Sequence, residues 1–153
     1  MSRLRFHGFS LLELLCALGV LSLVLAIALP RIPAVLQRLA VDQSVRRLAN
    51  ELELARVKAI SRNTRVRTII DVATSTYVVS IDSEGRFSPE GASRHLATGV
   101  WVDPAESTRV AGGRISITYV PRGNTADNAT IVVRAGPERK SVVVSAAGRV
   151  RTE

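Results

Sequence analysis

The chain has 153 residues, 46% of them hydrophobic, which suffices for one membrane segment and one small globular domain. It carries 21 Lys and Arg against 13 Asp and Glu, and the net charge of +8 suits an acidic partner. An arginine-rich composition can equally reflect the coding bias of the host. The single cysteine, Cys16, excludes an intrachain disulfide. With two histidines and no HExxH, CxxC or phosphate-loop motif, we expect no enzyme, no metal site and no cofactor.

The first predicted element is an apolar helix over residues 9–29. These 21 residues contain no proline, and Glu13 is their only charge. A helix of this length rises about 30 Å, the thickness of the hydrocarbon core of a bilayer. A carboxylate costs about 2.5–3.5 kcal/mol at full depth in the bilayer and less near the interface. The position of Glu13 therefore needs an explanation.

Two interpretations of this amino terminus leave Glu13 unexplained. A secretory signal peptide would use Arg3 and Arg5 as its basic region and a small-residue cleavage site ending at Ala28. The apolar region is long for such a signal, and it contains the glutamate. A plain membrane anchor tolerates the length, but basic residues on both sides of the segment barely favour one orientation.

A third interpretation gives the carboxylate a role. The stretch "HGFSLLELL" has a glycine after a short basic leader and a glutamate at the fifth position after that glycine. It resembles the class III signal of type IV pilins and type II secretion pseudopilins. The resemblance implies that a prepilin peptidase cuts after Gly8 and methylates Phe9, and that Glu13 is the retained acid. The family usually has Thr and Ile where this chain has Ser10 and Leu12.

Elementary electrostatics agrees with an assembly role for Glu13. Cleavage after Gly8 places an ammonium group on an apolar helix, and N-methylation keeps its charge. The Glu13 carboxylate of a neighbouring subunit can pair with that group, so two costly charges become one contact that sets the register of a fibre. The resemblance implies that the partners are prepilin peptidase, other pseudopilins and an inner-membrane assembly platform. It also implies a location in the bacterial inner membrane, crossed once, with the globular part in the periplasm.

Residues 1–8 are thus a predicted leader and residues 9–29 the membrane half of a long helix. We predict that the helix continues over residues 30–62. Pro30 matches a helix-kinking proline of pilins, and Asn63 can end the helix. An apolar stripe with steps of four and three indicates one buried face, which favours packing on a sheet over a coiled coil. The stripe consists of Val41, Val45, Leu48, Leu52, Ala55 and Ala59.

From residue 63 to 153 the pattern changes to short β-branched runs separated by turn residues. We predict strands within 65–72, 76–82, 99–103, 114–120, 129–135 and 140–146, and no second helix. The fold class is therefore α+β and pilin-like, with a long amino-terminal helix packed on a carboxy-terminal antiparallel β-sheet or β-sandwich. Trp101 has apolar neighbours, and we predict that it lies in the core.

The carboxy-terminal half resembles more narrowly the GspH/FimT group of minor pseudopilins. That group has an aromatic-x-Pro-x-Gly turn after a strand and a Gly-Arg end, which Tyr119, Pro121, Gly123, Gly148 and Arg149 match in order. The stretch "LELARVKAI" also matches its Ala-Arg-x-x-Ala helix end. The resemblance implies a subunit of the type II secretion pseudopilus, which helps to export folded proteins. We favour this function.

The alternative is a FimT-like minor pilin of type IV pili that binds DNA for natural transformation. The end "GRVRTE" satisfies the Gly-Arg-x-Arg tail of such relatives. Arg149 and Arg151, two apart on a strand, would point to one face and could meet adjacent phosphates, with Arg134, Arg139 and Lys140 nearby. No aromatic residue interleaves with them for base stacking. Arginines at a chain end are also often only a solvated face.

Overall fold

The computed structural model describes residues 10–153, and this part of the chain divides into two compact units between Leu36 and Gln37. The amino-terminal unit contains helix α1 (Leu11–Ala28), a short 3-10 segment η1 (Leu29–Arg31) and the first turn of helix α2 (Ile32–Ser61). The second unit, called the head from here on, contains the rest of α2 and all nine strands of the described chain.

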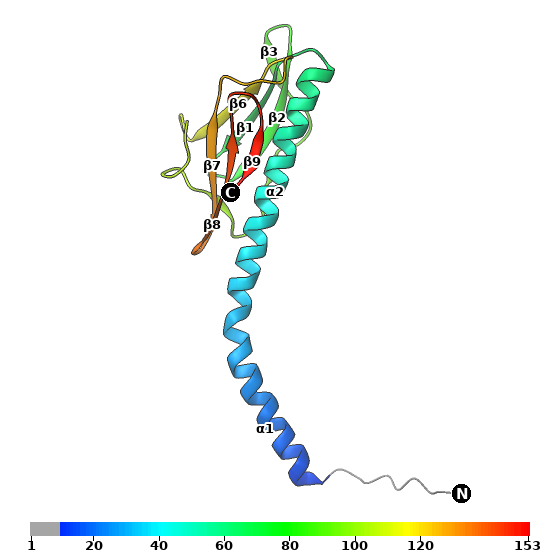
Figure 1. Cartoon of the computed structure of the whole chain (residues 1–153), viewed down its shortest axis with the longest axis vertical. Coiled ribbons are helices and arrows are strands. Elements are labelled where there is room, and N and C mark those ends of the chain that lie inside the picture. The colour runs from blue at the N-terminus through cyan, green and yellow to red at the C-terminus, as the bar shows by residue number, and fades with distance from the viewer. Residues whose placement is uncertain (1–9) are drawn as a thin grey trace, which may run out of the picture. The chain divides into compact units, whose positions relative to one another are not determined.

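In the head, α2 runs alongside the strands of two antiparallel sheets (Figure 1) and buries one face. The predicted stripe is buried from Val41 to Ala59, which confirms that this helix packs on sheets. The helix also ends near Asn63, as the sequence predicted. Asn63 adopts a left-handed conformation (φ 50°), and the N–H of Thr64 donates to the carbonyl of Ala59 at 3.2 Å. This is the hydrogen-bond pattern that ends many helices at glycine or asparagine.

One sheet contains strands in the order β3-β2-β1-β6, with β4 also paired to β2, and the other has the order β5-β7-β8-β9. Every pairing between named strands is antiparallel. The strands are β1 (Val66–Asp71), β2 (Thr76–Ser83), β3 (Arg86–Pro89), β4 (Arg94–His95), β5 (Trp101–Val102), β6 (Arg114–Tyr119), β7 (Ala129–Ala135), β8 (Glu138–Val144) and β9 (Val150–Thr152).

The core lies between α2 and the inner faces of these sheets. Leu48 and Leu52 of the helix are fully buried, as are Ile117 and Tyr119 of β6 and Ile131 of β7. Alternate residues of each long strand face this core, which agrees with the period of two in the sequence. The expected α+β, pilin-like fold is confirmed.

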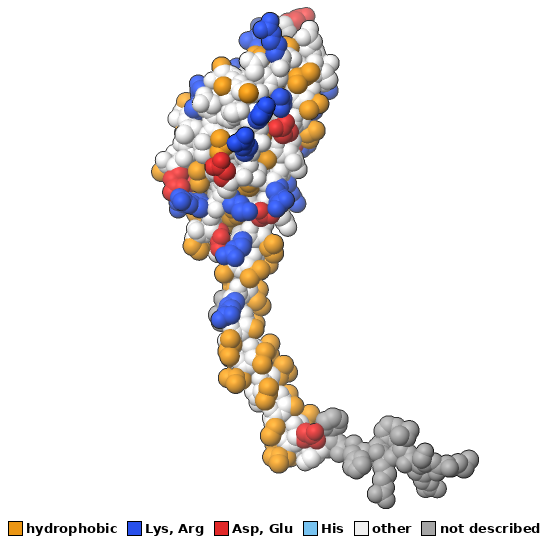
Figure 2. Space-filling view, in the orientation of Figure 1, with side chains coloured by type: hydrophobic (Ala, Val, Ile, Leu, Met, Phe, Trp, Pro, Cys, Tyr) orange, Lys and Arg blue, Asp and Glu red, His pale blue; other side chains and the backbone are white. Residues whose placement is uncertain are grey.

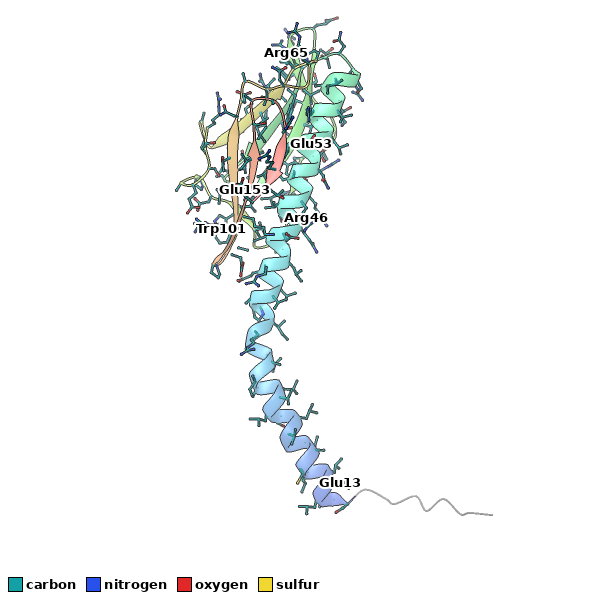
Figure 3. The ribbon with its side chains drawn as sticks, in the orientation of Figure 1. Glu13, Arg46, Glu53, Arg65, Trp101 and Glu153 are labelled. Atoms are coloured by element: carbon teal, nitrogen blue, oxygen red, sulfur yellow. The ribbon has the colours of Figure 1, made fainter. Side chains whose placement is uncertain are left out.

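The prediction for Trp101 was wrong, because this side chain is 43% exposed and lies on the surface of the head (Figure 3). Val100 and Val102, on either side of it, are both buried. Because neighbouring residues of a strand point to opposite faces, the two valines take the inward positions and the tryptophan is directed outward. The apolar neighbours that suggested a buried Trp101 are the reason for its exposure.

Candidate functional site

Helix α1 is exposed along its whole length and is almost uniformly apolar. None of its side chains is buried, and its mean hydropathy of 2.6 makes it long and apolar enough to cross a membrane. The space-filling view shows hydrophobic side chains along α1 and one acidic group at its start (Figure 2). The sequence prediction of an apolar membrane segment therefore has a structural counterpart in Leu11–Ala28.

Glu13 occupies the first turn of α1 (Figure 3). Ser10 caps this turn, since its hydroxyl accepts from the Leu12 N–H at 3.3 Å and its carbonyl accepts from the Leu14 N–H at 3.1 Å. The positive end of the helix dipole favours a carboxylate at this position. Glu13 forms no ion pair with any residue from 10 to 153. Gly8 and Phe9 lie outside the described residues.

Pro30 lies in η1, between the end of α1 and the start of α2. Proline has no backbone N–H and fixes its own φ, so it interrupts the regular hydrogen-bond ladder of an α-helix. The sequence predicted one helix kinked near Pro30, and the structure shows two α-helices joined by a 3-10 turn at that point.

Arg149 and Arg151 lie together on the β8–β9 hairpin. Arg151 is the register partner of Val143, and the Arg149 carbonyl accepts from the Ser145 N–H at 3.0 Å. Both arginines line one shallow groove with Val143, Ser145, Ala147 and Glu153. Both are exposed, and neither forms an ion pair within residues 10–153. The structure therefore brings these two predicted residues onto one solvent-facing surface.

The other basic residues proposed for this surface have acidic partners of their own. Arg139 pairs with Glu106 at 3.1 Å, and Arg134 pairs with Asp103 at 2.9 Å. Lys140 shares the α2-facing side of β8 with Val142 and Val144, and its Nζ lies 2.5 Å from Asp42 of α2. Lys140 is thus on the opposite face of the sheet from Arg149 and Arg151, because strand residues alternate between faces.

A contact between two turns and α2, not predicted from the sequence, holds the β8–β9 hairpin in place. We call it the glycine junction and define it by Arg56, Gly123 and Gly148. The Nε of Arg56 donates to the Gly123 carbonyl at 2.9 Å. Gly148 lies so close to the Gly123 carbonyl that a Cβ on Gly148 would be 2.0 Å from the carbonyl oxygen. Both glycines have positive φ, 80° and 77°, a conformation that disfavours other residues.

Neighbouring contacts reinforce this junction. The backbone N–H of Val150 donates to Glu53 of α2 at 3.1 Å, and the N–H of Thr125 donates to the Ala146 carbonyl at 3.0 Å. Figure 3 shows Glu53 on α2. The three short motifs in the sequence, around Arg56, Gly123 and Gly148, are therefore one structural unit. Each motif supplies one side of the contact.

Comparison with known proteins decides the family. The family model described as Type II transport protein GspH matches residues 44–148, which covers α2 from its middle and nearly all of both sheets. The chain belongs to the GspH family. A second model, the prokaryotic N-terminal methylation motif, matches residues 3–29 of this GspH-family chain. Gly8, Phe9 and Glu13 fall within that match.

The GspH-family chain also resembles individual proteins. It is 36% identical over 158 residues to the pilin-like protein PilA1 of Thermus thermophilus, over 96% of this chain and 98% of that one. The minor pseudopilin EpsH from the type 2 secretion system of Vibrio cholerae has a similar fold (TM-score 0.60, 16% identity, 74% of this chain and 95% of that one). So does the type IV minor pilin FimU of Pseudomonas aeruginosa (TM-score 0.58, 14% identity, 74% and 87%).

The chain is therefore a minor pseudopilin or type IV pilin-like subunit. The methylation motif implies processing by a prepilin peptidase and assembly with other pilins or pseudopilins. The family and the apolar helix α1 indicate membrane anchoring with a periplasmic head. Such proteins are structural subunits of fibres, and they assemble through contacts with neighbouring chains.

Proposed function

We propose that this chain is a minor pseudopilin of a type II secretion pseudopilus. It is stored in the bacterial inner membrane by α1 and enters the fibre through that helix to help export folded proteins. The observation that carries the proposal is the single carboxylate, Glu13, at the capped start of an apolar helix that buries none of its side chains. The description of the matched family, a type II transport protein, supports secretion as the process.

The mechanism is assembly by charge pairing. Cleavage after Gly8 creates an amino group at Phe9, and N-methylation leaves that group positively charged. Glu13 of one subunit pairs with the Phe9 amino group of its neighbour. An unpaired carboxylate in the apolar layer costs up to about 2.5–3.5 kcal/mol, and pairing recovers part of that cost, so fibre entry is favoured over storage in the membrane.

A charge substitution with a matched control tests this mechanism. We expect Glu13→Ala to be cleaved normally but to fail to enter the fibre, as scored by its absence from sheared or cross-linked fibres. Cys16→Ala lies on the same helix and removes no charge, so this variant should assemble as wild type does. Normal assembly of Glu13→Ala would refute the pairing mechanism.

A second candidate function, DNA binding by a type IV minor pilin, is favoured by one observation. Arg149 and Arg151 share an exposed groove and have no acidic partner within the described chain. Two guanidinium groups on one strand face can contact neighbouring phosphates. The pilin-like name of the Thermus relative also fits a pilus rather than a pseudopilus.

A clean deletion strain separates the two functions. Loss of proteins from the culture supernatant with normal uptake of added DNA would support the secretion pseudopilus. Loss of DNA uptake with an unchanged set of secreted proteins would refute it and support the transformation pilus. Complementation with Arg149→Ala/Arg151→Ala then shows whether DNA uptake depends on these two arginines.

A further inference from the structure

The outer face of the five-stranded sheet carries a second candidate surface, centred on one arginine and far in sequence from the carboxy terminus. On β1, Val66, Thr68 and Ile70 face the core, so Arg67 and Ile69 face outward. The register places Thr118 of β6 opposite Arg67 and Ser116 opposite Ile69. The ring of Phe87 of β3 lies beside Arg67 and therefore on the same face. We call the five residues Arg67, Ile69, Phe87, Ser116 and Thr118 the Arg67 patch.

Arg67 is held in one position by two contacts. Its guanidinium carbon lies 3.7 Å from the centroid of the Phe87 ring, and its Nε donates to the Thr118 hydroxyl at 3.2 Å. These contacts leave its two terminal nitrogens without a hydrogen-bond partner in the described chain. A guanidinium fixed in this way loses little conformational entropy when it binds a planar anion through that free edge.

Arg67 also differs from the neighbouring arginines because it has no acidic partner among residues 10–153. Nearby arginines on the same side of the sheet are paired: Arg65 with Asp82 at 2.6 Å, Arg114 with Asp71 at 3.3 Å and Arg109 with Asp127 at 3.4 Å. Three arginines of the described chain are half-buried, Arg56, Arg67 and Arg134, and of these only Arg67 has no carboxylate at salt-bridge distance.

We propose that the Arg67 patch is a docking surface for the head of a neighbouring fibre subunit, and that Arg67 accepts an Asp or Glu side chain of that subunit. A fixed arginine beside an aromatic ring is a frequent energetic centre of protein interfaces. Ile69 supplies apolar contact area next to it, and Ser116 and Thr118 supply hydroxyl groups for a polar margin. The proposal rests on the role of the chain as a fibre subunit, whichever process the fibre serves.

The same face is poorly suited to a nucleic acid. A phosphate backbone carries a charge on every nucleotide and therefore needs several unpaired cations along its path. Here Asp71, Asp82 and Asp127 lie among the arginines and already neutralise three of them. Within the described residues, Arg67 is the unpaired guanidinium among arginines of this face that already have acidic partners. Such an arrangement suits a single carboxylate on a protein surface.

Site-specific photo-cross-linking in cells tests this surface. A photoreactive benzoylphenylalanine replaces Ser116 in the full-length chain, and a control chain carries it at Ala105, which is exposed on the head after β5 of the other sheet. We expect the Ser116 probe to form an adduct with another pilin-like subunit, identified by mass spectrometry. Absence of a protein adduct from assembled fibres, or an adduct with nucleic acid, would overturn the proposal.

Substitutions at Arg67 then test its role. Losing a charge-assisted hydrogen bond corresponds to a loss in binding of about tenfold or more, so Arg67→Glu should reduce the adduct by that factor. Arg67→Lys keeps the charge without the planar fork and should give an intermediate yield. Arg86→Glu is the matched control and should leave the yield unchanged, because Arg86 is exposed, lies outside the patch and forms no ion pair within residues 10–153.

A charge exchange makes the test specific. Mapping of the adduct identifies acidic residues of the partner close to the probe, and changing the relevant one to Arg should restore the adduct with the Arg67→Glu chain. An equal adduct yield in wild type and in correctly folded Arg67→Glu would refute the role of Arg67. This test is distinguishable from the test of Glu13, because we expect Glu13→Ala to stay out of the fibre and Arg67→Glu to be processed and inserted into the membrane as wild type is.

Discussion

The glycine junction makes a quantitative prediction at Gly148. In Gly148→Ala, the new Cβ would lie 2.0 Å from the Gly123 carbonyl oxygen and 3.3 Å from the Arg56 Nε. The first of these atoms is backbone, so the β6–β7 turn must move and the hydrogen bond from Arg56 to Gly123 is lost. Alanine at φ 77° also costs about 1–2 kcal/mol by itself.

Gly85→Ala is the matched control. Gly85 has φ 86°, and a Cβ added there meets nothing within 4 Å, so its substitution measures the conformational term alone. Overpacking adds about 1–3 kcal/mol and loss of the hydrogen bond about 1 kcal/mol, so Gly148→Ala should cost about 3–6 kcal/mol and Gly85→Ala about 1–2 kcal/mol. For a unit of the size of the head, each kcal/mol lowers Tm by roughly 4 °C.

Thermal unfolding of the full chain in detergent, followed by fluorescence of its single tryptophan in the head, measures both variants. We expect the Tm of Gly148→Ala to fall by roughly 8 °C or more beyond that of Gly85→Ala. Equal Tm values for the two variants would refute the view that the two turns and α2 form one rigid contact.

The remaining predictions concern a buried hydroxyl and the basic pair. Tyr119 is fully buried, and its hydroxyl has no hydrogen-bond partner in the described chain. Burial, aided by Glu53, raises the pKa of Tyr119 well above its ordinary value, so its contribution to stability is complete below about pH 10 and is lost as the pH rises further. Urea unfolding at pH 8 to 11 should show that Tyr119→Phe is at least as stable as wild type and that its free energy of unfolding falls less as the pH rises. Part of this pH dependence should remain, because burial also raises the pKa of Tyr77. A steeper fall in the variant than in wild type would contradict this. If the chain binds DNA, Arg149→Ala/Arg151→Ala should weaken binding to all sequences alike and reduce its salt dependence, as measured by fluorescence anisotropy, and unchanged binding would exclude the basic pair as the contact.

The sequence predicted the parts of the fold that depend on periodicity. The stripe from Val41 to Ala59 identified the buried face of α2, and the long strands followed from alternation and turn residues. Strands β3 (Arg86–Pro89) and β4 (Arg94–His95) were missed because they are short, exposed and poor in β-branched residues. Trp101 was misplaced because apolar neighbours do not show which residues of a strand face inward.

Contacts between distant segments could not be read from the sequence. The glycine junction joins Arg56 to two turns that lie far along the chain, and only its short motifs signalled that those glycines matter. Arg67 resembled any other exposed arginine until the register placed Thr118 beside it and β3 supplied Phe87. Glu13 is the opposite case, because its role follows from an isolated charge in an apolar helix, which is a property of the sequence alone.

The intact mass of the membrane-extracted protein tests the central claim most directly. We predict the mass of a chain that begins at Phe9 and carries one methyl group, with Glu13 retained. The mass of the full 153-residue chain, or of a chain that begins at Leu29 after cleavage behind Ala28, would contradict assembly of a fibre through a processed amino-terminal helix.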